Sequence, residues 1–177
     1  MTKPMDKEYN ITINEKFSRL IFSKLKDIRN RSLKTPKLMI AESLTGGMIS
    51  DCLTGVAGIS EFYKGSLVAY CNTIKTAVLN VGEDTLEKHG AVSAETASRM
   101  ALSLGELYGA DLGIATTGIA GPGGGSAQKP VGLVYFGFFI NGAVSVERRI
   151  FSGGRDAIRR QATRFALAQL LRLIREL

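Results

Sequence analysis

The sequence predicts an α/β fold, a single three-layer α/β/α domain built on a mixed, mostly parallel sheet. Short apolar runs that suit buried strands alternate with segments in which apolar residues recur at helical spacing. Two further apolar runs are separated by Asn141-Gly142, a dipeptide typical of tight hairpins, which adds an antiparallel pair. The length of 177 residues suits one domain rather than two.

The chain is expected to begin with a polar lead-in over residues 1–13 and to continue as one domain over residues 14–177. Asn14 can cap a first helix, because an Asn side chain accepts hydrogen bonds from the free amides of a helix start. Pro36 follows this predicted helix and interrupts the chain. The apolar residues of the helix recur at helical spacing: Phe17, Leu20, Ile21, Leu25 and Ile28.

The next elements alternate between strand and helix. Residues 38–41 predict a buried strand, and residues 45–53 predict a helix that opens on two glycines. A second strand is expected over residues 66–70 and a short helix over residues 73–79. Ser93 is expected to cap an amphipathic helix with one apolar stripe: Ala97, Met100, Ala101, Leu104, Leu107 and Tyr108.

The C-terminal half supplies a strand, a hairpin and a helix. Residues 112–116 predict a buried strand that leads into a loop over residues 117–126, where five of ten residues are glycine. The hairpin strands are expected over residues 131–140 and 143–151. A last helix is expected from about Arg155, with Arg160, Arg164 and Arg172 opposite an apolar side: Ile158, Ala162, Phe165, Leu170, Leu173 and Ile174.

Basic residues concentrate in the two terminal segments. The net charge of +7 divides into +5 for residues 1–36, −3 for residues 37–146 and +5 for residues 147–177. A run of like charge is usually a solvated face of the protein. We therefore expect solvated terminal helices rather than a nucleic-acid interface.

The composition indicates a cytoplasmic protein. The longest apolar stretch, residues 131–140, is far shorter than a membrane span, so no membrane partner is expected. The N-terminus lacks the apolar core of a secretory signal. Cys52 and Cys71, the only cysteines, are expected to be free thiols in a reducing compartment.

Ser43 is the first candidate catalytic residue. It lies between a predicted strand and a predicted helix, where unpaired backbone N–H groups can stabilise an oxyanion. Gly46 and Gly47 would let a ligand approach these N–H groups closely. Because serine is also a common helix cap, this position alone fits a cap and a nucleophile equally.

Lys75 is the second candidate, just beyond a predicted strand that ends at Tyr70. Lysine acts as a base only when burial or nearby positive charge lowers its pKa; otherwise Lys75 is a surface residue and Tyr70 a packed aromatic. A Ser-His-Asp triad would need His89, the single histidine, which lies in a loop-like stretch without other signals. If Ser43 is a nucleophile, a Ser-Lys arrangement is the better candidate.

Two further segments could bind an anionic or flat ligand. The glycine-rich loop over residues 117–126 exposes backbone amides, although it matches neither the P-loop nor the dinucleotide fingerprint. A purely structural loop is the alternative. Arg155 in the first turn of the last helix opposes the helix dipole, which an anionic ligand at the free amides would explain. Alternatively, Asp156 neutralises Arg155 locally.

Five motifs occur in order along the chain, from about Leu38 to Leu173: AESLTGG, YKGSLVAYCNTIK, HGAVSAETA, TTGIAGPGGG and FSGGR. With these motifs the chain closely resembles the CinA carboxy-terminal domain family, also known as the PncC-type nicotinamide-nucleotide amidohydrolases. The resemblance implies a stand-alone form of this domain. It also implies that nicotinamide mononucleotide is hydrolysed to nicotinate mononucleotide and ammonia, without a metal or an organic cofactor.

The resemblance implies a role for three side chains: Ser43 as nucleophile, Lys75 as general base and Tyr70 as a partner in proton transfer. It makes Arg155 a cation of the substrate site and places the glycine-rich loop along the nucleotide pocket. With the residues around Ser43, the expected substrate-binding set is Thr45, Gly46, Gly47, Thr117, Gly118, Gly121, Gly123, Gly124 and Arg155.

Functions of other classes stay open from the sequence. The chain could be a catalytically silent nucleotide-binding or competence-linked module, whose basic terminal helices contact nucleic acid or a protein partner. It could also be a Ser-Lys amidohydrolase that acts on another carboxamide. The apolar stripes of the terminal helices can serve the core or a dimer interface, and a homo-oligomer is expected on general grounds.

Overall fold

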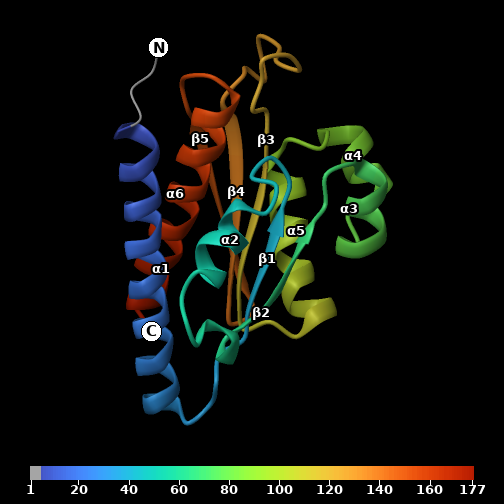
Figure 1. Cartoon of the computed structure of the whole chain (residues 1–177). Helices are drawn as coiled ribbons and strands as arrows, with labels where there is room; N and C mark the ends of the chain where they lie inside the picture. Colours follow the sequence, from blue (N-terminus) through green and yellow to red (C-terminus); the bar gives the residue numbers. More distant parts are fainter. Residues whose placement is uncertain (1–4) are drawn as a thin grey trace.

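The computed structural model describes the backbone of residues 5–177 and the side chains of residues 13–177. In Figure 1 a central sheet lies between two layers of helices, which confirms the predicted three-layer α/β/α domain. In chain order the elements are α1 (Met5–Ser32), β1 (Leu38–Glu42), α2 (Met48–Thr54), the short 3-10 helix η1 (Ile59–Glu61), β2 (Tyr63–Val68), α3 (Asn72–Leu79), α4 (Glu83–His89), α5 (Ala94–Tyr108), β3 (Leu112–Gly118), β4 (Leu133–Ile140), β5 (Ala143–Ile150) and α6 (Arg155–Arg175).

The five strands of the sheet follow the order β2-β1-β3-β4-β5. β1 pairs in parallel with β2 and with β3, whereas β4 is antiparallel to both of its neighbours. Four of the five strands therefore point in the same direction, which confirms a mixed, mostly parallel sheet. Because β1, β2 and β3 are parallel, the loops that follow them gather at one edge of the sheet.

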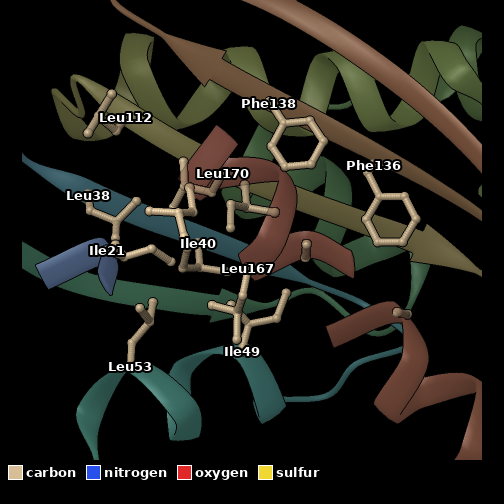
Figure 2. Close-up of a cluster of buried hydrophobic side chains, with 14 of the residues drawn as sticks. Ile21, Leu38, Ile40, Ile49, Leu53, Leu112, Phe136, Phe138, Leu167 and Leu170 are labelled. Atoms are coloured by element: carbon tan, nitrogen blue, oxygen red, sulfur yellow. The ribbon is translucent and has the colours of Figure 1, made fainter. Parts of the chain in front are cut away.

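Two hydrophobic cores cover the two faces of the sheet, because successive residues of a strand point to opposite faces. In β1, Leu38 and Ile40 join the core under α1, α2 and α6, whereas Met39 and Ala41 join the core under α3 and α5. Figure 2 shows the first core, with these side chains labelled: Ile21, Leu38, Ile40, Ile49, Leu53, Leu112, Phe136, Phe138, Leu167 and Leu170.

The first helix is longer than the sequence predicts. α1 begins at Met5, nine residues before the expected cap Asn14, so the predicted polar lead-in over residues 1–13 is wrong from Met5 onward. Residues 1–4 lie outside the described residues. Polar composition alone does not end a helix, and the segment from Met5 to Ser32 contains neither glycine nor proline to interrupt it.

β2 and α4 also differ from the prediction. β2 spans Tyr63–Val68 instead of residues 66–70, because its pairing with β1 begins at Tyr63 and its last paired residue is Val68. α4 occupies residues for which the sequence predicts neither a helix nor a strand. Its sequence, EDTLEKH, contains one apolar residue, Leu86, and therefore shows no helical periodicity.

The hairpin turn and the start of α5 lie as predicted, although β4 begins at Leu133 rather than at residue 131. Asn141 and Gly142 have φ angles of 47° and 94°, the left-handed pair that a type I′ turn requires. Ser93 caps α5, because its hydroxyl accepts a hydrogen bond from Thr96 N at 3.1 Å. In the described part of the chain, no helix is long and apolar enough to cross a membrane.

Candidate active site

The candidate active site lies at the edge where the parallel strands end. Ser43 follows β1, Tyr70 follows β2, and Thr117 and Gly118 close β3. Arg155 reaches the same place from the first turn of α6. These residues and their neighbours line a pocket of ≈ 250 Å³: Ser43, Leu44, Tyr70, Lys75, Ala91, Val92, Thr117, Gly118, Ala120 and Arg155.

Ser43 and Lys75 are within hydrogen-bond distance, although 32 positions separate them in the sequence. Lys75 Nζ donates to Ser43 Oγ at 3.1 Å and to Ala69 O at 2.7 Å. The Lys75 residue is only 1% exposed, and no ion pair in the described part of the chain includes it. Burial lowers the pKa of Lys75 below its ordinary value, against an opposing influence of the Cys71 charge. The amine therefore loses its proton more readily than that of a surface lysine.

The path of the chain after β2 explains why Lys75 is buried. Ala69 N still donates to Glu42 O at 2.8 Å, so the chain follows β1 up to this point. α3 then begins at Asn72, which puts Lys75 in its first turn, directly beyond the strand ends. From there the side chain reaches back to Ala69 O, and this carbonyl holds the amine beside Ser43.

Ser43 opens a tight turn over residues 43–47, called the serine turn below. Gly46 and Gly47 have left-handed φ angles of 59° and 96°, conformations that glycine adopts without steric cost. For this reason α2 begins three residues later than predicted. Ser43 N donates to Thr116 O at 3.1 Å, which joins the start of the turn to β3.

Glu42, rather than Ser43, caps α2. Its carboxylate is fully buried and accepts hydrogen bonds from the amides of Gly47, Ile49 and Ser50 at 2.9, 3.2 and 3.0 Å, and from Ser50 Oγ at 2.6 Å. The alternative in which Ser43 merely caps the helix is therefore wrong. The expectation that Gly47 N stabilises an oxyanion is wrong too, because this amide already donates to Glu42. A charged residue at the end of an apolar strand was the available signal for Glu42.

Arg155 connects two sides of the pocket. Its Nη1 donates to Gly121 O at 2.9 Å, and its Nη2 donates to Tyr70 Oη at 2.9 Å. Asp156 pairs with Arg160 instead, so the interpretation in which Asp156 neutralises Arg155 is wrong. A guanidinium carries five N–H donors, and these two contacts leave others for an anionic ligand.

Only the first part of the glycine-rich loop reaches the pocket. Thr117 and Gly118 line it, and Gly121 contributes the carbonyl that Arg155 contacts. Gly123 and Gly124 are exposed and lie outside the pocket lining. The structure therefore does not bring these two predicted residues to Ser43.

The remaining predicted substrate residues lie behind the pocket rather than in its wall. Thr45 is buried, and its Oγ1 lies 2.9 Å from Oγ1 of Thr116, which holds the serine turn to β3. Gly46 and Gly47 are likewise absent from the pocket lining. Their role in the structure is to shape the turn.

The loop before α5 forms one wall of the pocket, which the sequence analysis missed. Ala91 and Val92 line this wall, and Thr117 Oγ1 donates to Ala91 O at 2.6 Å. His89 is outside the lining, and its carbonyl accepts a hydrogen bond from Lys129 Nζ at 2.6 Å. A short apolar pair in a loop gives no sequence signal that distinguishes it from ordinary packing.

Arg159 is a second residue that the sequence analysis missed. Its Nε donates to Leu44 O at 2.9 Å and its Nη2 to Thr45 O at 3.0 Å, so it binds the serine turn from α6. One signal was available: Arg159 lies one helical turn after Arg155 and therefore shares its face of the helix.

A larger hollow of ≈ 500 Å³ lies between α1, α2 and α6, with Cys52 in its lining. Burial, with a further contribution from the Asp51 charge, raises the pKa of the Cys52 thiol to about 11. The thiol thus stays protonated at neutral pH and is a poor nucleophile compared with a thiolate. Cys52 and Cys71 are both free, which confirms the sequence prediction.

The profile of the CinA C-terminal domain family matches residues 23–174, and the chain belongs to this family. It is 47% identical over 150 residues to a CinA-like protein of Petrotoga mobilis, a match that covers 85% of this chain and 37% of that protein. It is 45% identical over 139 residues to a putative competence-damage inducible protein of Alkaliphilus metalliredigens, which covers 78% of this chain and 34% of that protein. The chain thus spans little more than a third of the length of these curated relatives.

Solved structures share the fold over nearly their whole length. A competence or damage-inducible protein from Enterobacter asburiae is 34% identical, with a TM-score of 0.84, and the match covers 91% of this chain and 98% of that one. The competence/damage inducible protein CihA from Agrobacterium tumefaciens is 41% identical, with a TM-score of 0.80, over 91% of this chain and 95% of that one.

Proposed function

We propose that the chain is an amidohydrolase that converts nicotinamide mononucleotide to nicotinate mononucleotide and ammonia, with Ser43 as nucleophile and Lys75 as general base. One observation carries the proposal: a buried amine, which has no carboxylate partner among the described residues, lies 3.1 Å from a serine hydroxyl in a pocket wall. Burying an ammonium is unfavourable, so a catalytic role explains the position of Lys75. The family resemblance of the motifs supports the same reaction.

In the first step, Ser43 Oγ attacks the carboxamide carbon while the neutral Lys75 Nζ takes the hydroxyl proton. Ala69 O accepts one N–H of the amine and holds the nitrogen beside Ser43, whose proton its lone pair can then accept. The lowered pKa of Lys75 increases the neutral fraction at a given pH. Gly46 N and Gly47 N, the oxyanion donors expected from the sequence, lie outside the pocket lining, so neither is assigned this role.

In the second step, the tetrahedral intermediate collapses and the C–N bond breaks. Lys75, now an ammonium, returns the proton to the leaving nitrogen by way of Tyr70, and ammonia departs. Tyr70 Oη accepts a hydrogen bond from Arg155, so its own proton stays free to donate. Water then attacks the nicotinoyl ester, Lys75 takes a proton from it, and that proton restores the Ser43 hydroxyl as the acid leaves.

The pocket fits one end of such a substrate. Its volume of ≈ 250 Å³ lies below the range of about 300–1,000 Å³ that is typical for whole drug-sized ligands. We therefore place the nicotinamide ring in the pocket, against the apolar Ala91 and Val92, and the ribose phosphate outside it. The free N–H donors of Arg155 would bind the phosphate, for which a guanidinium is well suited.

The test is ammonia release from a panel of nicotinamide-containing nucleotides, with Ser43→Ala beside the parent protein. Ser43→Ala is expected to abolish turnover and to keep nucleotide binding, measured by calorimetry, because it removes only the attacking oxygen. Ser60→Ala, at an exposed serine of η1, is the matched control and should retain the parent rate.

Two outcomes would contradict the proposal. Ammonia release by Ser43→Ala at the parent rate would show that Ser43 is not the nucleophile. Nucleotide binding without turnover by the parent protein would favour the alternative of a catalytically silent nucleotide-binding module.

A further inference from the structure

Arg159 binds the serine turn at the carbonyl groups of Leu44 and Thr45, the two residues between Ser43 and Gly46. The Arg159 guanidinium donates to Leu44 O at 2.9 Å and to Thr45 O at 3.0 Å, reaching across more than a hundred positions of sequence. Within the described residues, Thr45 O also accepts a longer hydrogen bond from Met48 N, at 3.3 Å. Arg159 itself is not part of the pocket lining.

The two contacts fix how the turn is oriented. In a trans peptide group the C=O and the following N–H lie in one plane and point in opposite directions. When Arg159 holds Leu44 O and Thr45 O, the amides of Thr45 and Gly46 must point away from α6. The same constraint fixes the main chain that directly follows Ser43, and with it the position of the serine oxygen.

The other contacts hold the two ends of the turn and Thr45, and among the described residues they leave the Leu44 carbonyl to Arg159. Glu42 holds the amides after the turn, from Gly47 onward. Thr116 holds the beginning, through Ser43 N at 3.1 Å, and the Thr45 hydroxyl at 2.9 Å. Space is also tight there, because a Cβ at Gly46 would lie 3.1 Å from Nη2 of the same arginine.

We propose that Arg159 is a positioning residue that holds the serine turn from α6, so that Ser43 Oγ stays within proton-transfer distance of Lys75. The amine is held independently by Ala69 O. Loss of the arginine therefore separates the two reacting groups without altering Lys75 itself. The inference rests on the proposed function only in that turnover is one of its two readouts.

The first readout is steady-state turnover of Arg159→Ala and Arg159→Lys. We expect kcat to fall by about 100-fold in the alanine variant, a loss typical of a displacement near 1 Å at the reacting groups. KM should change little, and the midpoint of the pH profile should stay in place, because Lys75 keeps its surroundings. The kcat of Arg159→Lys, whose side chain can reach one carbonyl, should lie between those of the parent protein and of Arg159→Ala. Millimolar guanidinium should partly restore the kcat of the alanine variant. Arg160→Ala, the next arginine of α6, is the matched control.

Other results would overturn the inference. An unchanged kcat would show that the turn holds its shape without Arg159. A rise in KM at constant kcat would make Arg159 a substrate-binding residue, and a shifted pH midpoint would make its role electrostatic. Loss of kcat that neither lysine nor guanidinium restores, together with a lower melting temperature, would reduce Arg159 to a structural residue.

The second readout does not depend on the substrate. A small sulfonyl fluoride reacts with an activated serine: Ser43 Oγ bonds to sulfur, fluoride leaves, and Lys75 takes the proton. Mass spectrometry gives the labelling rate of Ser43, which should fall in Arg159→Ala in parallel with kcat. Labelling of the parent protein without hydrolysis of any nicotinamide nucleotide would refute the proposed function while this rate still decides the role of Arg159. A parent protein that shows neither reaction would refute both.

Discussion

Two loops beside the same pocket are held very differently. The serine turn, residues 43–47, is bound on every side by Glu42, Thr116 and Arg159. The glycine-rich loop projects from the top of the sheet in Figure 1, and its residues 122–126 are exposed. Thr117 and Ile119 fix its first residues, through Ala91 O and through the main chain of Leu133 and Gly132. Beyond them its hydrogen bonds are few: Arg155 binds Gly121 O, and a local turn joins Ser126 and Lys129.

The difference shows how one edge of a sheet can serve two needs. Proton transfer requires donor and acceptor atoms within a few tenths of an ångström of the reactive geometry, which a densely hydrogen-bonded turn provides. Entry and release of a substrate require a segment that can move, which an exposed loop provides. Changes at the serine turn should therefore lower kcat, and changes along the glycine-rich loop should raise KM.

The largest effect is expected from Lys75→Met, which removes the amine that contacts Ser43 and tests whether this side of the pocket controls kcat. Methionine fills the same buried volume but cannot accept the Ser43 proton, so ammonia release should fall to the background rate. Lys88→Met, at an exposed lysine of α4, is the control and should keep full activity. Turnover by Lys75→Met near the parent rate would mean that another group is the base.

The same variant gives a prediction on stability. Burial lowers the pKa of Lys75 in the folded state, so the unfolded chain holds this proton up to the ordinary value of 10.5 while the folded chain has already lost it. The stability of the parent protein therefore rises with pH between the folded pKa and 10.5. Below the folded pKa, Lys75 is charged in its buried site, and the stability of the parent protein is lowered by the full cost of burying that charge.

Urea unfolding of the parent and of Lys75→Met over a pH series measures this effect. The stability of Lys75→Met relative to the parent should be greatest in acid and should decline once the pH passes the folded pKa. The hydrogen bond lost at Ala69 O shifts the whole curve by a constant and leaves its slope. A relative stability that stays constant up to pH 10.5 would contradict a lowered pKa for Lys75.

The next largest effect is expected from Arg155→Ala, at a residue of α6 that contacts the glycine-rich loop at Gly121. This change removes the guanidinium that we assign to the substrate phosphate, and hydrogen bonds to charged groups contribute about 1.5–3 kcal/mol. KM for nicotinamide mononucleotide should rise about tenfold or more. Nicotinamide riboside, which lacks the phosphate, is the matched control substrate and should show a much smaller change. Equal increases in KM for both substrates would show that Arg155 does not bind the phosphate.

Much of the fold could be predicted because it depends on local patterns. The apolar run of β1, the Ser93 cap of α5 and the turn at Asn141-Gly142 each have a signature within a few residues. α4 could not be found this way, since Leu86 alone gives no periodicity. The start of α1 was missed because a helix and a loop can both have a polar composition.

The residues of the candidate site also differ in whether a local sequence pattern reveals them. Ser43 and Lys75 could be singled out because each follows a predicted strand, and adjacent parallel strands bring their ends together. Glu42 and Arg159 carry only weak sequence signals, because their partners are mostly backbone atoms, which the sequence does not identify. The contact between Arg159 and Leu44 spans 115 positions and depends on how α6 packs against the sheet. Only a three-dimensional arrangement reveals such a contact.

The smallest effects are expected within the glycine-rich loop. Alanine variants of Gly123 and Gly125 test whether changes in this loop affect KM rather than kcat. A Cβ at Gly125 would lie 2.9 Å from both Cγ2 and N of Val131, so Gly125→Ala must displace the loop. A Cβ at Gly123 would meet nothing within 4 Å, so Gly123→Ala leaves the loop in place. We expect Gly125→Ala to raise KM by about two- to fivefold with kcat nearly constant, and Gly123→Ala to have a smaller effect, since positioning losses scale with displacement. A fall in kcat for Gly125→Ala at constant KM would show that the glycine-rich loop, like the serine turn, holds the reacting groups.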